Sequence, residues 1–103
     1  MAEMADRIVV NVDSDLEDLI PGFMDNRRKD LVKLEEMIGA RDFDALCKIG
    51  HSIKGVGGGY GFDAITDFGA VIEKAAESQD IAALGRCQAE YADYLARVDV
   101  VFE

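Results

Sequence analysis

The sequence predicts an all-α fold, an antiparallel up-down four-helix bundle with a short extra helix at its N-terminal end. In four segments, apolar residues recur at gaps of three and four, the spacing that gives a helix one apolar face. Only short connections separate these segments, so neighbouring helices should run antiparallel. Of the 103 residues, 50% are hydrophobic and one is proline, which fits a single compact helical domain.

The N-terminal part of the chain predicts a tail followed by a short helix. Residues 1–12 are expected to form the tail, which ends in a short extended piece at residues 8–12. Residues 13–103 are expected to form the bundle. Ser14 and Glu17 have the spacing of a capping box, which is typical of a helix start.

The first two long helices follow from apolar spacing and from the residues that bound it. Pro21 interrupts the short helix and suits the first turn of the next one, which is expected to end near Gly39. Asp42 is a good N-cap for a helix over residues 43–60. A break follows near Gly61.

The last two helices are predicted in the same way. Asp63 is expected to cap a helix whose apolar stripe runs from Ile65 to Ala75. Asp80 is expected to cap the final helix, whose apolar positions continue to Phe102. No pair of segments has a convincing strand pattern, so no sheet is expected.

The net charge argues against nucleic-acid binding, and the cysteine spacing argues against a metal site. The net charge is −10, with 21 acidic and 11 basic residues, and nucleic acid is therefore not an expected partner. The one basic run, residues 27–29, lies among acids and indicates a solvated helix face. Cys47 and Cys87 are far apart and form no CxxC pair, so we expect no metal site.

Nothing in the sequence indicates export or a membrane. Residues 1–7 are acidic and polar and lack the apolar core of a signal peptide. No apolar run approaches membrane-spanning length. We therefore expect a cytoplasmic protein that makes no membrane contact and is a monomer.

The only histidine, His51, is the strongest candidate for a functional residue. On a helical wheel it falls roughly 160° from Ile53, the centre of the apolar stripe, so its ring should face solvent. Lys54 lies three residues on and is its neighbour on the helix surface. Glycines on this face would leave the ring open to another molecule. The candidate partner-binding residues of this face are Lys48, Gly55, Gly58 and Phe62.

The run His-Ser-Ile-Lys-Gly at residues 51–55, with Gly61 ten positions after the histidine, resembles the motif of histidine-containing phosphotransfer (HPt) domains of two-component phosphorelays. The resemblance covers residues 13–102. The motif and its glycine-rich continuation are especially similar to the phosphoacceptor domain of chemotaxis histidine kinases, which shares the HPt fold. Because these 103 residues contain no dimerisation, ATP-binding or coupling domain, we expect the chain to differ from those kinases in this respect. It departs from most HPt motifs in having glycine at 57–59, where alanine or serine is usual.

The resemblance implies a role for each residue of the site. His51 would be the phosphoacceptor, and Lys54 would neutralise part of the phosphoryl charge. A side chain of the next helix would bond the other ring nitrogen, and the residue twenty-two positions on is Glu73. The partners implied are a response-regulator receiver domain, a histidine kinase, or both. Mg²⁺ is expected on the receiver, and this chain is expected to need no cofactor.

The function predicted is that of a phosphoryl carrier and not of an enzyme. His51 would carry the group from a histidine kinase or a receiver phospho-aspartate to another receiver. Two alternatives stay open: a non-transferring HPt-like module that only binds receivers, and a stand-alone phosphoacceptor domain of a chemotaxis-type kinase. A hydrolase that uses His51 as a base is less well supported, because the open face offers no serine or cysteine nucleophile beyond Cys47, which is expected to be only marginally exposed. Further apolar candidates for docking are Phe43 and the short helix around Leu16, Leu19 and Ile20.

Overall fold

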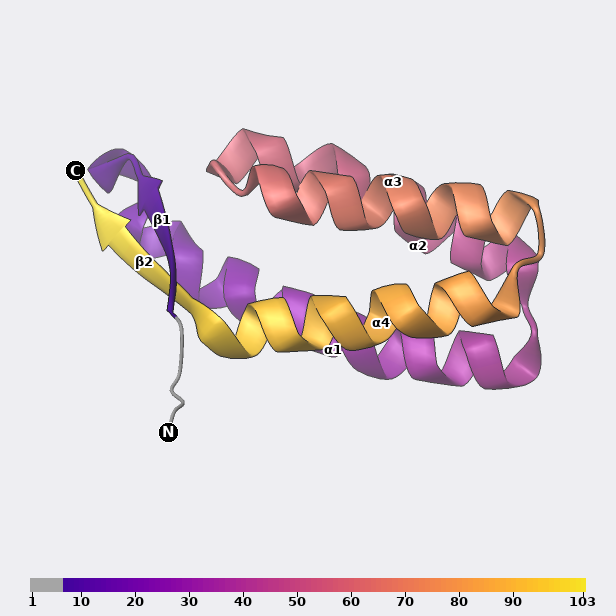
Figure 1. The fold of residues 1–103 in the computed structure, drawn as a ribbon. Helices are drawn as coiled ribbons and strands as arrows, with labels where there is room; N and C mark the ends of the chain where they lie inside the picture. The colour runs from indigo at the N-terminus through magenta and orange to yellow at the C-terminus, as the bar shows by residue number, and fades with distance from the viewer. Residues whose placement is uncertain (1–6) are drawn as a thin grey trace.

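The structure is a computed structural model, and it describes residues 7–103. Residues 1–6, the first half of the predicted tail, lie outside the described part. Within it, two short strands and two 3₁₀ helices accompany four α-helices (Figure 1). In chain order the elements are β1 (Ile8–Val12), η1 (Ser14–Leu19), α1 (Ile20–Ala40), α2 (Phe43–Gly57), η2 (Gly58–Tyr60), α3 (Asp63–Glu77), α4 (Ile81–Arg97) and β2 (Val98–Phe102).

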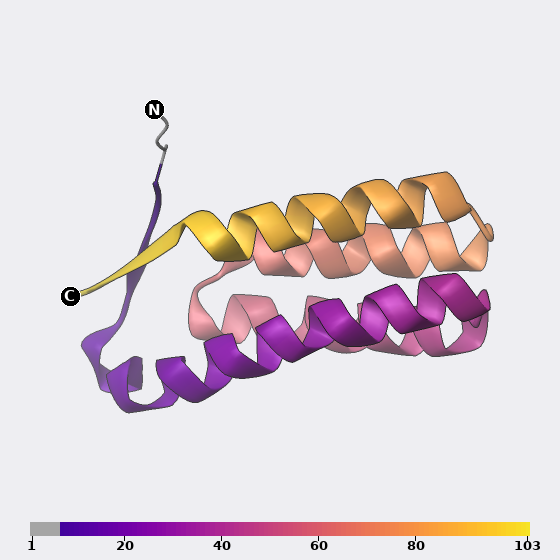
Figure 2. The ribbon, with the colours of Figure 1, turned by 90° about the horizontal axis from the view of Figure 1, so that it is seen from below.

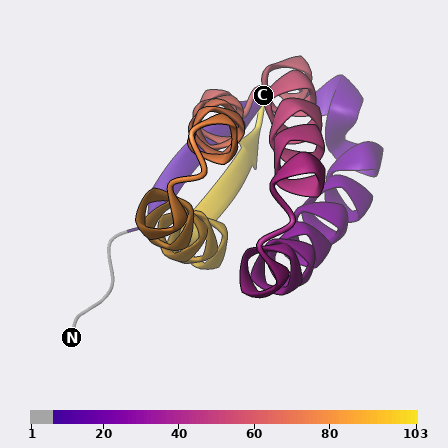
Figure 3. The ribbon, with the colours of Figure 1, turned by 90° about the vertical axis from the view of Figure 1, so that its right-hand side faces the viewer.

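The predicted four-helix bundle is confirmed. Successive helices run in opposite directions, and seen end on they surround one axis (Figures 1 and 3). Each helix packs mainly against two neighbours, in the cyclic order α1, α2, α3, α4. Apolar side chains from all four helices meet in one core, and the largest that are fully buried are Tyr91, Phe62, Leu34, Leu46, Ile53, Ile65, Ile72 and Leu84.

One carboxylate is buried in this core among the described residues. Asp30 of α1 is 6% exposed, and it accepts a hydrogen bond from Arg27 Nε at 2.7 Å. The Tyr91 hydroxyl donates to the same Oδ2 atom at 3.4 Å. Burial raises the pKa of Tyr91, so this hydroxyl keeps its proton and remains a donor. The network satisfies Asp30 and joins α1 to α4.

Two of the predicted N-caps are confirmed and two are wrong. Asp42 and Asp80 each accept a hydrogen bond from a backbone N–H three residues on, at 3.1 and 3.0 Å. The capping box at Ser14 does not form, because its N–H donates to the Glu103 carbonyl, and Asp13 is the N-cap of η1. Asp63 is the first residue of α3 rather than its cap.

The absence of strands was a wrong expectation. The last helix ends at Arg97, and Val98–Phe102 forms β2, which pairs in parallel with β1 in the register Ile8↔Val98 to Val12↔Phe102. β-branched residues dominate both segments and favour extended structure. The extended piece expected at residues 8–12 is therefore a strand at one end of the bundle, and not a free tail (Figure 2). Its last residue, Val12, is 2% exposed and belongs to the core.

Candidate functional site

The site is formed where α2 and α3 approach each other most closely. A Cβ built on Gly50 of α2 would lie 2.6 Å from the backbone nitrogen of Glu73 of α3. A Cβ on Gly57 would lie 2.6 Å from the backbone nitrogen of Thr66. Only glycine permits such an approach, because any side chain would push the two helices apart. The side chains of α3 are thereby brought against the exposed face of α2.

His51 lies on that exposed face, as predicted. Its side chain is 73% exposed, and it stands at the middle of α2, three residues after Lys48. Its Nδ1 atom lies 3.2 Å from Oε2 of Glu73. The pairing of these two residues across α2 and α3 agrees with the geometry that the resemblance implies.

Lys54 binds the other oxygen of the same carboxylate. Its Nζ lies 3.0 Å from Glu73 Oε1, so Glu73 bridges the lysine and the histidine. The hydrogen bond from Lys54 lowers the pKa of Glu73 the most, desolvation opposes it, and the charge of Lys54 and the contact with His51 lower it further. Glu73 is therefore ionised near neutral pH.

The ionised carboxylate determines which ring nitrogen carries the proton. A carboxylate only accepts hydrogen bonds, so the bond to His51 requires the hydrogen to be on Nδ1. In the neutral ring the lone pair is then on Nε2. With 73% of the side chain exposed, Nε2 is available to a molecule that approaches from solvent. The arrangement provides a fixed tautomer, a nucleophilic nitrogen and a nearby cation.

Thr66 secures the end of α2 that carries Lys54. Its Oγ1 donates a hydrogen bond to the Lys54 carbonyl at 3.0 Å, and the next turn of α3 places Gly69 against the Lys54 backbone. Thr66 and Gly50 were not among the predicted site residues, and the inward position of Gly57 was not predicted. A signal for the glycines was present, because both fall within about 60° of Ile53 on a helical wheel and so share its buried face.

Three of the four predicted partner-binding residues are exposed. Lys48, Gly55 and Gly58 all face solvent on α2 or the 3₁₀ turn that follows it. No atom lies within 4 Å of a Cβ built on Gly55, and only Thr66 Oγ1, at 3.6 Å, lies near one on Gly58. The backbone beyond His51 is therefore open on this side.

The expectation that Phe62 lies on the exposed face is wrong. Its side chain is 0% exposed, and its ring stacks on Phe23 of α1 with centroids 5.1 Å apart. The helical phase that predicted exposure ends at Gly61, where φ is +87° and the chain turns toward α3. Phe62 therefore enters the core and takes the N-cap position of α3.

The apolar docking candidates of the N-terminal region differ in exposure. Ile20 is buried in the core, which contradicts its place on a docking surface. Leu16 and Phe43 are half-buried, whereas Leu19 is 53% exposed. Of these four residues, only Leu19 presents most of its side chain to solvent.

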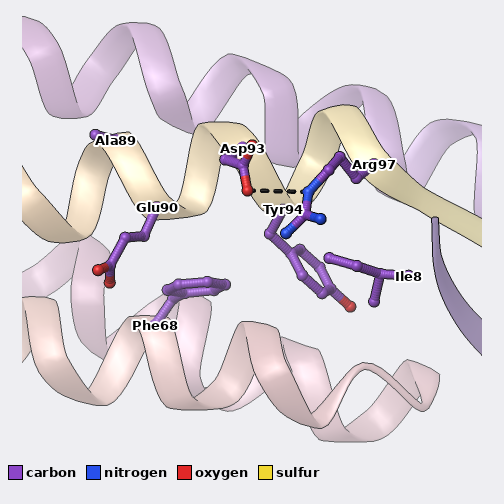
Figure 4. Close-up of a pocket in the computed structure, with 7 residues that line it drawn as sticks. All are labelled: Ile8, Phe68, Ala89, Glu90, Asp93, Tyr94 and Arg97. Atoms are coloured by element: carbon purple, nitrogen blue, oxygen red, sulfur yellow. Dashed lines mark hydrogen bonds and ion pairs between the residues drawn. The ribbon is translucent and has the colours of Figure 1, made fainter. Parts of the chain in front are cut away.

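A separate hollow of about 470 Å³ lies between α3 and α4, beside β1 (Figure 4). Phe68, Tyr94 and Ile8 provide its apolar wall, and Asp93 pairs with Arg97 at its edge at 3.0 Å. None of its lining residues belongs to the His51 site. Among residues 7–103, no group of three or more histidine, cysteine, aspartate or glutamate side chains is placed to hold a metal ion.

No helix in the described part of the chain is both long enough and apolar enough to cross a membrane. Comparison with protein families gives one finding about the chain: the model of the family described as Hpt domain matches residues 18–100. That range includes all four helices and the residues of the site. No curated protein and no solved structure matches the chain.

Proposed function

Because the chain belongs to the Hpt domain family, the phosphoryl carriers of phosphorelays, we propose that Nε2 of His51 is the atom that carries the phosphoryl group. One observation supports this assignment above the others. His51 is 73% exposed while its Nδ1 contacts the ionised Glu73, which leaves Nε2 free and nucleophilic.

The proposed reaction is an in-line displacement at phosphorus. Nε2 of the neutral ring attacks the phosphoryl group of a receiver phospho-aspartate, a N–P bond forms, and the bond from phosphorus to the aspartate oxygen breaks. The aspartate leaves as a carboxylate. The ring becomes a phospho-imidazolium that keeps its hydrogen on Nδ1, and the negative charge of Glu73 stabilises it. With a histidine kinase and ATP as donor, Nε2 attacks the γ-phosphorus of ATP bound to the kinase, the bond from that phosphorus to the β,γ-bridging oxygen breaks, and ADP leaves.

Lys54 is proposed to act on the charge of the transferred group. Its ammonium lies one turn from His51 and is 42% exposed, so it can contact phosphoryl oxygens while Glu73 holds it near the ring. Transfer reverses when a second receiver presents an unphosphorylated aspartate. Mg²⁺ is proposed to be supplied by the receiver, and a cytoplasmic location stays part of the proposal.

The test is radioactive labelling of the full chain by a phosphorylated receiver, or by a histidine kinase with ATP. The label should be acid-labile and alkali-stable, as a phosphoramidate bond requires, and His51→Gln should abolish it. Arg86→Gln, a substitution at an exposed position of α4, is the matched control and should label normally. Labelling that persists in His51→Gln would refute the assignment. Binding of a receiver without any label, unchanged in His51→Gln, would instead identify a non-transferring module.

A further inference from the structure

A hollow of about 460 Å³ lies between α1 and α2. These two helices pack against each other and lie side by side when the bundle is seen end on (Figure 3). The walls of the hollow include Arg27, Asp30 and Lys33 of α1 and Lys48, Ile49 and Ser52 of α2. We call it the α1–α2 groove. The groove shares α2 with the His51 site: Lys48 precedes His51 by three residues and Ser52 follows it directly, whereas His51 itself does not line the groove.

The groove has a charge opposite to that of the chain. Asp30 is its only acidic wall residue, and Arg27 neutralises it at 2.7 Å. Lys33 and Lys48 then give the groove a net positive charge. Both are exposed, and neither forms an ion pair within residues 7–103.

This local charge is notable because the chain as a whole has a net charge of −10. With 21 acidic residues against 11 basic ones, most surface positions would repel an acidic partner. The groove is a place beside His51 where carboxylates would be attracted instead. Ile49 adds apolar surface to the floor, so a partner can bury contacts there as well as pair charges.

We propose that the α1–α2 groove is a docking surface for a receiver domain that places carboxylate side chains against Lys33 and Lys48 while His51 engages its aspartate. This inference rests on the proposed function and adds to it the chemistry of the partner surface. Charge pairs at the rim of an interface act mainly on the association rate and on its dependence on salt. The two lysines should therefore control how fast a receiver docks, and not the chemistry at His51.

The experiment compares two charge-reversed double variants of the full chain. Lys33→Glu with Lys48→Glu reverses the groove, and Lys74→Glu with Arg86→Glu makes the same change in net charge on exposed positions of α3 and α4. Two rates are measured for each: phosphoryl transfer from a phosphorylated receiver at sub-saturating concentration, and labelling by phosphoramidate. Phosphoramidate is a small donor that needs no docking surface, so it reports His51 alone.

At low salt the groove variant should be slower in transfer from the receiver by about tenfold or more, and the difference should shrink as ionic strength rises. The control variant should change by less than about threefold, since its charges lie away from the groove. Phosphoramidate labelling should fall far less than transfer from the receiver in the groove variant, because this small donor needs only the ring and not the groove. Lys33→Gln with Lys48→Gln, which removes charge without adding repulsion, should show a smaller loss with the same salt dependence.

The outcomes separate this inference from the proposed function. Equal transfer rates in the groove and control variants would overturn the docking surface, and so would a loss of the same size in phosphoramidate labelling of the groove variant. In both cases labelling of the parent chain on His51 would leave the proposed function standing. Failure of the parent chain to accept phosphoryl groups from any donor would refute the proposed function instead. Far-UV circular dichroism on each variant verifies that a slow rate does not reflect unfolding.

Discussion

Gly69 of α3 lies directly against the backbone of Lys54 of α2. A Cβ at position 69 would meet the backbone nitrogen and Cα of Lys54 and the carbonyl oxygen of Gly50. The same segment of α3 carries Glu73 one turn further on, so the spacing of the two helices determines whether its carboxylate reaches His51 and Lys54. The geometry of the proposed phosphoryl site thus depends on a backbone contact beneath it.

Gly69→Ala should therefore weaken both the fold and the site. The added methyl group meets backbone and not a flexible side chain, so we expect a loss of about 1–3 kcal/mol in unfolding free energy. Urea denaturation measures this, and phosphoramidate labelling of His51 should slow as Glu73 moves. Gly85→Ala, where a Cβ meets nothing within 4 Å, is the control and should gain about 0.5–1 kcal/mol. Equal stability of the two variants would contradict the close contact.

Gly55→Ala should separate stability from docking. A Cβ at this position also meets nothing within 4 Å, so the helix should gain about 0.8–1 kcal/mol. The methyl group, however, projects from the exposed face one turn beyond His51, where we propose that a receiver approaches. We expect slower transfer from a phosphorylated receiver and unchanged labelling by phosphoramidate. A variant that is more stable and equally fast with the receiver would show that the partner does not come close at Gly55.

The sequence predicted the parts of the site that follow from helical periodicity. The exposure of His51 could be predicted from its angular position relative to Ile53 on a helical wheel, because both residues belong to one helix. The contact with Glu73 involves two helices, so no local pattern could predict it. It was predicted from the family resemblance instead. Its confirmation in the geometry therefore supports the resemblance.

The wrong prediction for Phe62 lies where the helical spacing of apolar residues in α2 ends. Phe62 was placed by continuing the phase of α2 through Gly61, but the positive φ of that glycine redirects the chain and buries the ring. Among the glycines, only Gly55 and Gly58 were predicted to shape the site, on its open face, whereas Gly50 and Gly57, which had no predicted role, face α3. Their phase relative to Ile53 places both on the buried face of α2, so the helical period did contain this signal.

The strand pair could not be found from local pattern, because its partners lie about ninety positions apart. Residues 98–102 have apolar residues at positions that fit the end of an amphipathic helix as well as a strand. Parallel pairing with β1 decides between them, since it provides partners for the backbone groups of both segments. Long-range pairing thus overrides the local helical signal.

Val12→Ala tests whether β1 is part of the folded core. Val12 is 2% exposed on the inner side of the strand, so truncation should cost roughly 2 kcal/mol in unfolding free energy. Val9→Ala is the matched control, because Val9 is 59% exposed on the outer side and should change stability by less than about 0.5 kcal/mol. Urea denaturation of the two proteins measures the difference. Equal effects would mean that β1 does not pack against the bundle in solution.

Glu73→Gln should make the contribution of this carboxylate visible as a dependence on pH. Lys54, through its hydrogen bond and charge, and His51 lower the pKa of Glu73 in the folded protein. As pH falls, the unfolded chain therefore binds a proton at this residue before the folded chain does. The stability that the carboxylate provides is complete above the unfolded pKa of glutamate and is lost as pH falls through the lowered folded pKa.

Because glutamine does not ionise, the parent chain should be more stable than Glu73→Gln near neutral pH, and the two should converge once Glu73 is protonated. Urea denaturation of both proteins across the acidic range measures this convergence. Labelling should also distinguish substitutions, because the glutamine oxygen still accepts a hydrogen bond from Nδ1 whereas Glu73→Ala leaves the ring without a partner. Phosphoramidate should therefore label the parent fastest, Glu73→Gln more slowly and Glu73→Ala slowest. A parent and a glutamine variant that differ by the same amount at every pH would show that the Glu73 carboxylate is not held ionised by Lys54 and His51.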